Sequence, residues 1–108
     1  MDLVQIQFAI DDPEAADAIV EQLLSERLVA CGQRTGPMVS RFWWRGSIEW
    51  ADEWLVVLKT RADLRDQVIG AVLDLHPYET PEVVALAIAA SGPGYLDWVA
   101  EVTADASR

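Results

Sequence analysis

The chain has 108 residues, of which 52% are hydrophobic, so it carries enough apolar side chains for the core of one folded domain. Its 18 acidic and 8 basic residues give a formal net charge of −10, which would repel a phosphate backbone or an anionic membrane. We therefore predict a single domain over residues 1–108, with a frayed tail from about residue 103 and with neither a nucleic acid nor a membrane as partner.

The start of the chain predicts a cytoplasmic protein. Residues 1–5 contain no basic segment leading into a long apolar run, which a secretory signal would need. No stretch reaches the roughly 20 apolar residues that span a bilayer. The single cysteine, Cys31, excludes a disulfide within the chain.

A strand and a helix are predicted first. Apolar residues alternate with polar or small ones from Val4 to Ile10, which is the period of a half-buried strand. Asp12 and Pro13 then mark a helix start, because the carboxylate accepts from free amides of the first turn and proline has no amide to satisfy. Apolar residues at helical spacing continue to Leu28.

The middle of the chain is predicted to form a β-hairpin. Gly36-Pro37 marks a bend, and residues 38–44 are rich in side chains that favour strands. Residues 53–60 are nearly all apolar, which is typical of a strand covered on both faces. The turn between the two strands fits either residues 45–47 or residues 51–52, and the pattern does not choose between them.

Two helices and one strand complete the chain. A helix is predicted to begin near Thr60, with Asp63 in a capping position, and to end at Pro77. Residues 81–90 form the next strand. A glycine- and proline-rich break at residues 91–94 then precedes a short final helix.

This order of elements predicts an α+β fold of the ferredoxin-like βαββαβ type with an extra C-terminal helix. One face of such a sheet lacks helices. Aromatic residues around the hairpin are the expected contacts between subunits there, because wide apolar side chains need a surface to cover them. These interface candidates are Phe42, Trp43, Trp44, Trp50 and Trp54.

Three stretches, with a fourth short segment, carry a resemblance to a known family. They are Leu28-Val29-Ala30-Cys31; Trp44-Arg45-Gly46-Ser47-Ile48-Glu49 with Val57-Leu58-Lys59-Thr60; His76-Pro77-Tyr78-Glu79-Thr80-Pro81-Glu82; and Tyr95-Leu96-Asp97-Trp98. The chain resembles the CutA family of divalent-cation tolerance proteins over nearly its whole length. The stretch that begins with His76 is the most specific of these pieces.

The resemblance implies a homotrimer, similar in architecture to the PII nitrogen-regulatory proteins, with a long central hairpin that reaches across subunits. It places the hairpin turn nearer Ala51-Asp52 and makes Gly46 a bulge. It also implies a role in tolerance of copper and other divalent metal cations.

Cys31, His76 and Glu79 are the candidate metal ligands. Thiolate and imidazole suit copper and zinc. One cysteine and one histidine cannot fill a four-coordinate site, so carboxylates, water or copies from other subunits would complete a weak or subunit-bridging site for copper or another divalent cation. Folding would need no metal. Alternatively, Cys31 is a small core residue and His76 caps a helix C-terminus.

A second class of function is a regulatory trimer that binds a small ligand in clefts between subunits, as the PII-like architecture implies. Trp44, Lys59, Tyr78 and Glu79 are its candidate residues. Two prolines fix the path of residues 77–81, which could form either a rigid binding loop or a plain helix-to-strand connection. The family resemblance favours the binding loop, because this stretch carries the most distinctive residues of the family.

An enzyme is the third class. Cys31 and His76 would have to lie within hydrogen-bond reach to act as nucleophile and base. An apolar setting would raise the pKa of the Cys31 thiol and oppose that role. We therefore predict no catalysis.

Overall fold

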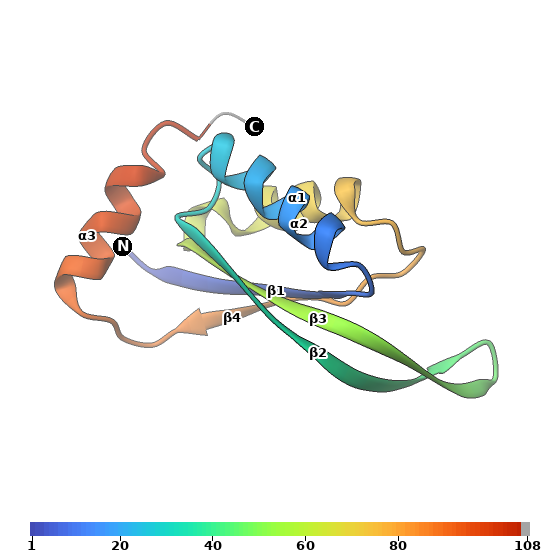
Figure 1. Ribbon diagram of the computed structural model, residues 1–108. Coiled ribbons are helices and arrows are strands. Elements are labelled where there is room, and N and C mark those ends of the chain that lie inside the picture. The colour runs from blue at the N-terminus through green and yellow to red at the C-terminus, as the bar shows by residue number, and fades with distance from the viewer. Residues whose placement is uncertain (107–108) are drawn as a thin grey trace.

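The computed structural model describes residues 1–106, which form a four-stranded sheet, three α-helices and a 3₁₀ turn (Figure 1). The sheet has the order β2-β3-β1-β4, and all neighbouring strands are antiparallel. This arrangement confirms the predicted ferredoxin-like α+β fold with an extra C-terminal helix. In chain order the elements are β1 (Leu3–Ile10), α1 (Pro13–Ser25), β2 (Cys31–Trp44), β3 (Ser47–Arg61), η1 (Ala62–Leu64), α2 (Arg65–Leu75), β4 (Val83–Ile88) and α3 (Pro93–Val102).

The core lies between the sheet and the helices α1 and α2, which cover one face, as Figure 1 shows. Ile6, Phe8 and Ile10 of β1 point into it and are fully buried, as the alternation predicts. Val56 and Leu58 of β3 pair with Phe8 and Ile6 and are buried beside them. Burying each such side chain stabilises the fold by roughly 1.5–3 kcal/mol.

The opposite side of the sheet is free of helices except at one end, where α3 packs against Leu3 and Ile88. We call it the helix-free face. Leu55 and Val57 of β3 lie on it and are only half-buried. The prediction that residues 53–60 are covered on both faces is therefore wrong for the single chain, because helices cover one face only.

The hairpin turn is Arg45-Gly46, and its placement at Ala51-Asp52 by family resemblance is wrong. Both turn residues have positive φ, 49° and 85°, as the two-residue turn that matches strand twist requires. Ala51 and Asp52 pair with Ser40 and Val39 inside the ladder.

The irregularity in the hairpin lies at Gly36-Pro37, where the register shifts between Thr35 and Met38. Gly36 has a φ of 139°, and a Cβ there would lie 2.8 Å from a ring atom of Trp54. Beyond this point β3 pairs with β2 alone. Residues 38–53 thus form a two-stranded arm that projects from the body (Figure 1).

Helix α1 begins as predicted, because Asp12 Oδ1 accepts from the amides of Glu14 and Ala15 at 2.9 and 3.3 Å. It ends at Ser25, since Arg27 adopts a left-handed φ of 58°. Leu28 is therefore buried outside the helix and not on its last turn.

The predicted start of the second helix is wrong. Thr60 belongs to β3, and its hydroxyl donates to the Leu28 carbonyl at 2.6 Å. A 3₁₀ turn precedes α2, which begins at Arg65 without a side-chain cap. Asp63 instead forms an ion pair with Arg61 at 3.1 Å.

The chain stays packed beyond the residue at which fraying was predicted. Thr103 is buried, and its hydroxyl donates to the Val99 carbonyl at 2.6 Å. Ala106 packs against the core. Residues 107–108 of the predicted tail lie outside the described residues.

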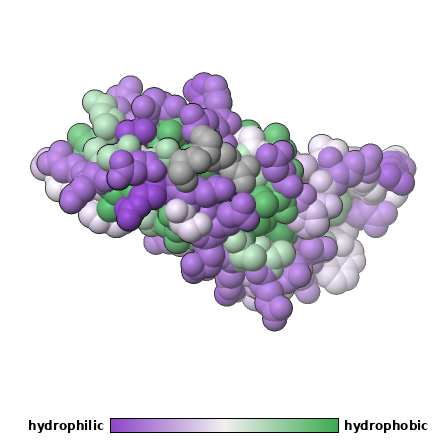
Figure 2. Space-filling model, turned by 90° about the horizontal axis from the view of Figure 1, so that it is seen from above, coloured by the Kyte–Doolittle hydropathy of each residue, from purple (hydrophilic) through white to green (hydrophobic). Residues whose placement is uncertain are grey.

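The molecule is elongated, with extents of 45 × 26 × 21 Å. Seen from above, its surface is mainly hydrophilic over the helices, and the arm extends at one end (Figure 2). Within the described residues, no helix is long and apolar enough to cross a membrane.

Candidate functional site

The three predicted metal ligands do not come together in one chain. Cys31 begins β2 and lies opposite Lys59, which in turn pairs with Gln5 of β1. His76 follows α2 and bonds the carbonyl of Ala9, four residues further along β1. That offset is roughly 13 Å at the rise of an antiparallel strand. The nucleophile–base pair considered for an enzyme is therefore not formed.

His76 is held by both ring nitrogens. Its Nδ1 accepts from the Tyr78 amide at 3.1 Å, so the proton lies on Nε2, which donates to the Ala9 carbonyl at 2.8 Å. The ring is buried between the rings of Phe8 and Tyr78, with edge contacts to both. His76 does occupy the C-cap position of α2, but its ring fastens the helix end to β1.

Cys31 is half-buried, and its Sγ lies 3.4 Å from the hydroxyl oxygen of Tyr95 on α3. Burial, followed by the contact with Cys31, raises the pKa of Tyr95 to about 12. The Tyr95 hydroxyl is thus neutral at physiological pH. This pair ties the start of β2 to the last helix.

A cleft of about 750 Å³ lies between the arm and the loop after α2. Trp44, Tyr78 and Glu79 line it, so three of the four predicted cleft residues meet in one chain. Lys59 does not, because its Nζ donates to Gln33 at 2.7 Å on the body of the sheet. The full lining is Ala9, Asp11, Met38, Ser40, Arg41, Phe42, Trp43, Trp44, Glu49, Ala51, Glu53, Tyr78, Glu79, Thr80 and Glu82.

Glu53, for which the sequence pattern predicts no functional role, lies in the wall of this cleft with 7% of its surface exposed. Its carboxylate accepts from the Tyr78 hydroxyl at 2.8 Å. Burial is the main cause that raises the pKa of Tyr78, followed by the hydrogen bond and charge of Glu53 and the charge of Asp11. The sequence does contain one signal for Glu53, since it is an acidic residue at the start of the mainly apolar stretch 53–60. Acidic side chains are almost never fully buried unless they are paired, so such a position points to a specific partner.

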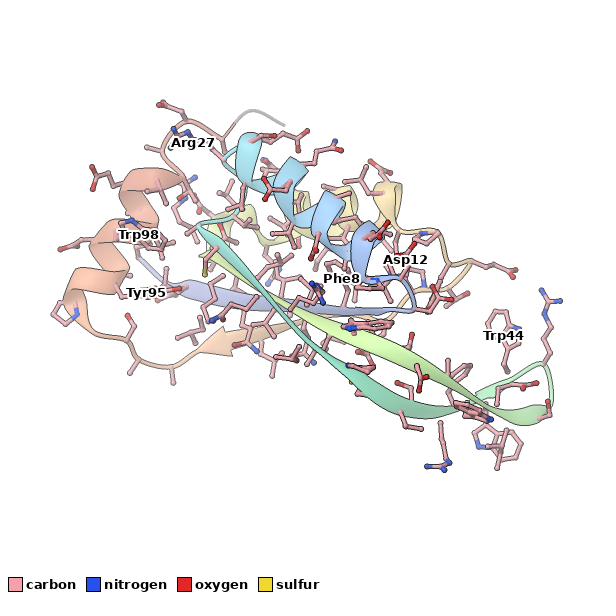
Figure 3. All side chains as sticks on the ribbon, in the orientation of Figure 1. Phe8, Asp12, Arg27, Trp44, Tyr95 and Trp98 are labelled. Carbon is pink, nitrogen blue, oxygen red and sulfur yellow. The ribbon has the colours of Figure 1, made fainter. Side chains whose placement is uncertain are left out.

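Arg45, in the turn of the arm, contacts two residues of the cleft wall but does not line the cleft itself. Its guanidinium lies 5.3 Å from the centre of the Trp44 ring and forms an ion pair with Glu79 at 3.1 Å. The turn of the arm is thereby joined to the loop after α2. Trp44 lies at the opposite end of the molecule from Tyr95 and Trp98 (Figure 3).

Residues 4–102 match the family model described as CutA1 divalent ion tolerance protein. The chain belongs to the CutA family. The divalent-cation tolerance protein CutA of Pyrococcus horikoshii is 33% identical over 101 residues, which cover 94% of this chain and 98% of that one. The mouse protein CutA is 35% identical over 95 residues, or 88% of this chain and 54% of the mouse protein.

Solved CutA structures have the same fold. The Xylella fastidiosa CutA has a TM-score of 0.91 and 32% identity, and the match covers 95% of this chain and 99% of that one. A CutA from Archaeoglobus fulgidus, named as a periplasmic divalent cation tolerance protein, has a TM-score of 0.90 and 34% identity over 94% and 98% of the two chains. This chain spans about half the length of the rice and mouse relatives.

Among residues 1–106, no three His, Cys, Asp or Glu side chains converge as metal ligands. Glu79 pairs with Arg45, and both nitrogens of His76 are engaged. Among the three predicted ligands, Cys31 is the one whose side chain makes only a weak hydrogen bond, to the Tyr95 hydroxyl, so metal binding would disrupt least there.

Four of the predicted interface residues are exposed on the arm, with Trp43 at 73% and Trp50 at 66%. Phe42 and Trp44 are less exposed, and Trp54 is half-buried beside Gly36. Further exposed apolar side chains are Val39, Ile48, Val84 and Leu86.

Proposed function

We propose that this CutA protein acts in the cytoplasm as a non-catalytic homotrimer that binds divalent metal cations, copper among them. The family is named for divalent-cation tolerance. The apolar surface left uncovered on the arm and on the helix-free face supports assembly, because a monomer exposing it would tend to associate. Phe42, Trp43, Trp44, Trp50 and Trp54 are the proposed contacts.

The observation that carries the metal proposal is the position of Cys31 on the helix-free face, in register with Lys59 and Gln5. Faces that meet around a threefold axis bring equal copies of a residue toward one another. Cys31 thiolates from several subunits would then form a weak, subunit-bridging copper site. His76 and Glu79 would join it only after releasing the partners that they hold here.

Calorimetric titration of copper and zinc into the purified protein, with native mass spectrometry in parallel, tests this function. We expect saturable copper binding at a fixed ratio to the trimer. Cys31→Ala should abolish it, whereas His76→Ala and Glu79→Gln should weaken it less. Glu101→Gln is the control, because Glu101 is an exposed residue of α3 and its replacement should leave copper binding unchanged. Copper binding that is unchanged in Cys31→Ala would refute Cys31 as a ligand, and a monomeric mass would refute the trimer.

A second candidate function is a trimer that senses a small ligand. The specific observation in its favour is the cleft of about 750 Å³ that unites Trp44, Tyr78 and Glu79. This volume suits a small molecule, and aromatic walls with a few polar groups are typical of ligand sites.

A further inference from the structure

One side of β3 carries charges of opposite sign at its two ends. Side chains alternate along a strand, so the odd-numbered residues of β3 share the side of the helix-free face. Toward the arm this row carries Glu49 and Glu53, which both line the cleft. Toward its other end the row carries Lys59 and Arg61, and only apolar residues of the row stand between Glu53 and Lys59. Each chain thus presents an acidic end and a basic end on the side proposed for assembly.

Glu53 has no cationic partner among residues 1–106, where none of the ion pairs includes it. It is buried, and its carboxylate accepts a hydrogen bond from the neutral hydroxyl of Tyr78. Arg41 also lines the cleft, but it pairs with Trp50 in the ladder and so lies on the other side of the arm. A carboxylate buried without a cation is costly, so a cation from outside the chain would stabilise it.

Lys59 lacks an anionic partner in the same way. Its Nζ donates to the neutral side-chain amide of Gln33 at 2.7 Å, and none of the ion pairs within residues 1–106 includes it. In the body of the sheet, outside the arm, no strand position on the helix-free face is acidic. If another subunit covers this face, as proposed above, the ammonium group loses water and needs a carboxylate.

Glu53 and Lys59 cannot pair within one chain. Six residues separate them along β3, which is about 20 Å at the rise of an antiparallel strand. In a ring of subunits, however, a residue of one copy contacts a different residue of the next copy. The arm projects from the body, so its acidic end can reach the body of a neighbouring subunit (Figure 1).

We propose that the subunits pack head to tail, with Lys59 of one chain placed against Glu53 of the next. The ammonium group enters the cleft beside the arm and supplies the positive charge that Glu53 lacks. The cleft wall is then part of the contact between subunits, together with the aromatic residues of the arm. This inference rests on the trimer proposed above, and it names the ion pair that sets the direction of the ring.

A double-mutant cycle on the full chain tests this ion pair, with dissociation of the trimer on dilution followed by sedimentation velocity. Glu53→Gln keeps an acceptor for the Tyr78 hydroxyl, and Lys59→Gln keeps a polar side chain beside Gln33. Each single change should raise the dissociation constant at least about tenfold. The double variant should dissociate no more readily than the more affected single variant, because the second change removes a partner already lost. Losses that multiply in the double variant would overturn the pair.

Arg65→Gln is the matched control for the removal of a positive charge. Arg65 lies on α2, on the helix-covered side of the sheet, and forms an exposed ion pair with Asp66. This change should leave the dissociation constant unchanged, both alone and combined with Glu53→Gln. An effect as large as that of Lys59→Gln would overturn the proposal, because net charge and not position would then govern assembly.

Mixed trimers provide a test that a folding defect cannot imitate. Glu53→Lys and Lys59→Glu each place like charges at every contact of their own trimer, so each variant alone should be monomeric. Mixing the two variants places unlike charges at most contacts of a mixed trimer. Native mass spectrometry should then detect trimers that contain both chains. A mixture that stays monomeric, with both variants folded by circular dichroism, would contradict the proposal.

The proposed trimer and this ion pair fail separately. A monomeric unmodified chain would overturn the trimer and the ion pair with it. A stable trimer in which the two losses multiply would overturn the ion pair alone. A coupled pair in a trimer that binds no copper would overturn the metal function and leave this inference standing.

Discussion

Thr60 shows how single buried polar groups hold this chain together. It is the last residue of β3 that faces the helices, and it is fully buried. Its hydroxyl satisfies the Leu28 carbonyl in the loop after α1, at 2.6 Å. His76 does the same between the end of α2 and the Ala9 carbonyl of β1. Both contacts join segments that are distant in the sequence, and a buried carbonyl without a donor would be costly.

We expect Thr60→Val to lower the free energy of unfolding by about 1–2 kcal/mol. Valine keeps the shape of the threonine side chain, but the Leu28 carbonyl loses its hydrogen-bond donor. Urea denaturation measures the change. Thr103→Val is the matched control: the Val99 carbonyl keeps the Thr103 amide as a donor at 3.2 Å, so its cost should be smaller. Equal losses in the two variants would contradict this account of Thr60.

The arm and α2 place glycine in opposite backbone environments. Gly46 lies in the turn of the arm with a φ of 85°, whereas Gly70 lies inside α2 with helical geometry. A Cβ at either position would meet no atom within 4 Å. The effect of adding a side chain at Gly46 or Gly70 should therefore depend on the backbone conformation alone.

The same substitution should thus have opposite effects in the two elements. Gly46→Ala is expected to destabilise the protein by about 1 kcal/mol, because alanine resists a positive φ. Gly70→Ala is expected to stabilise it by about 0.5–1 kcal/mol, because glycine weakens a helix interior. Thermal and urea unfolding of both variants measure the difference. Destabilisation by both changes would show that packing in an assembly, and not local backbone preference, governs these positions.

For the whole molecule, the decisive feature is apolar surface that one chain leaves uncovered. Leu86 is 46% exposed on the helix-free face, and Trp43 and Trp50 are exposed on the arm. Polar residues cover most of the side that carries α1 and α2 (Figure 2). This asymmetry is typical of a subunit that associates through one side.

We expect Leu86→Glu to shift the protein from trimer to monomer in sedimentation velocity, because three buried carboxylates would meet no partner in an interface. Leu73→Glu on α2 is the matched control, since Leu73 is exposed to a similar degree, 51%, on the opposite side. It should leave the trimer intact. Assembly that withstands Leu86→Glu, or that Leu73→Glu also breaks, would move the interface away from the helix-free face.

Local patterns predicted much of this molecule before any contact was known. The alternation from Val4 to Ile10 predicted β1, and Asp12 predicted the start of α1. The predictions that failed involve tertiary context. Family resemblance predicts the hairpin turn at Ala51-Asp52, whereas it lies at Arg45-Gly46. The spacing predicts a cap at Asp63, whereas this residue pairs with Arg61.

The sequence by itself determined the order of elements, the ferredoxin-like fold and the family, because periodicity, capping residues and motifs are local properties of the chain. Only the tertiary structure decided which chemical groups meet. It separated Cys31 from His76, engaged both nitrogens of His76, and placed buried Glu53 beside Tyr78 in one cleft. These contacts depend on strand register and on the twist of the arm. Both bring together residues that are far apart in the sequence and whose proximity no local pattern predicts.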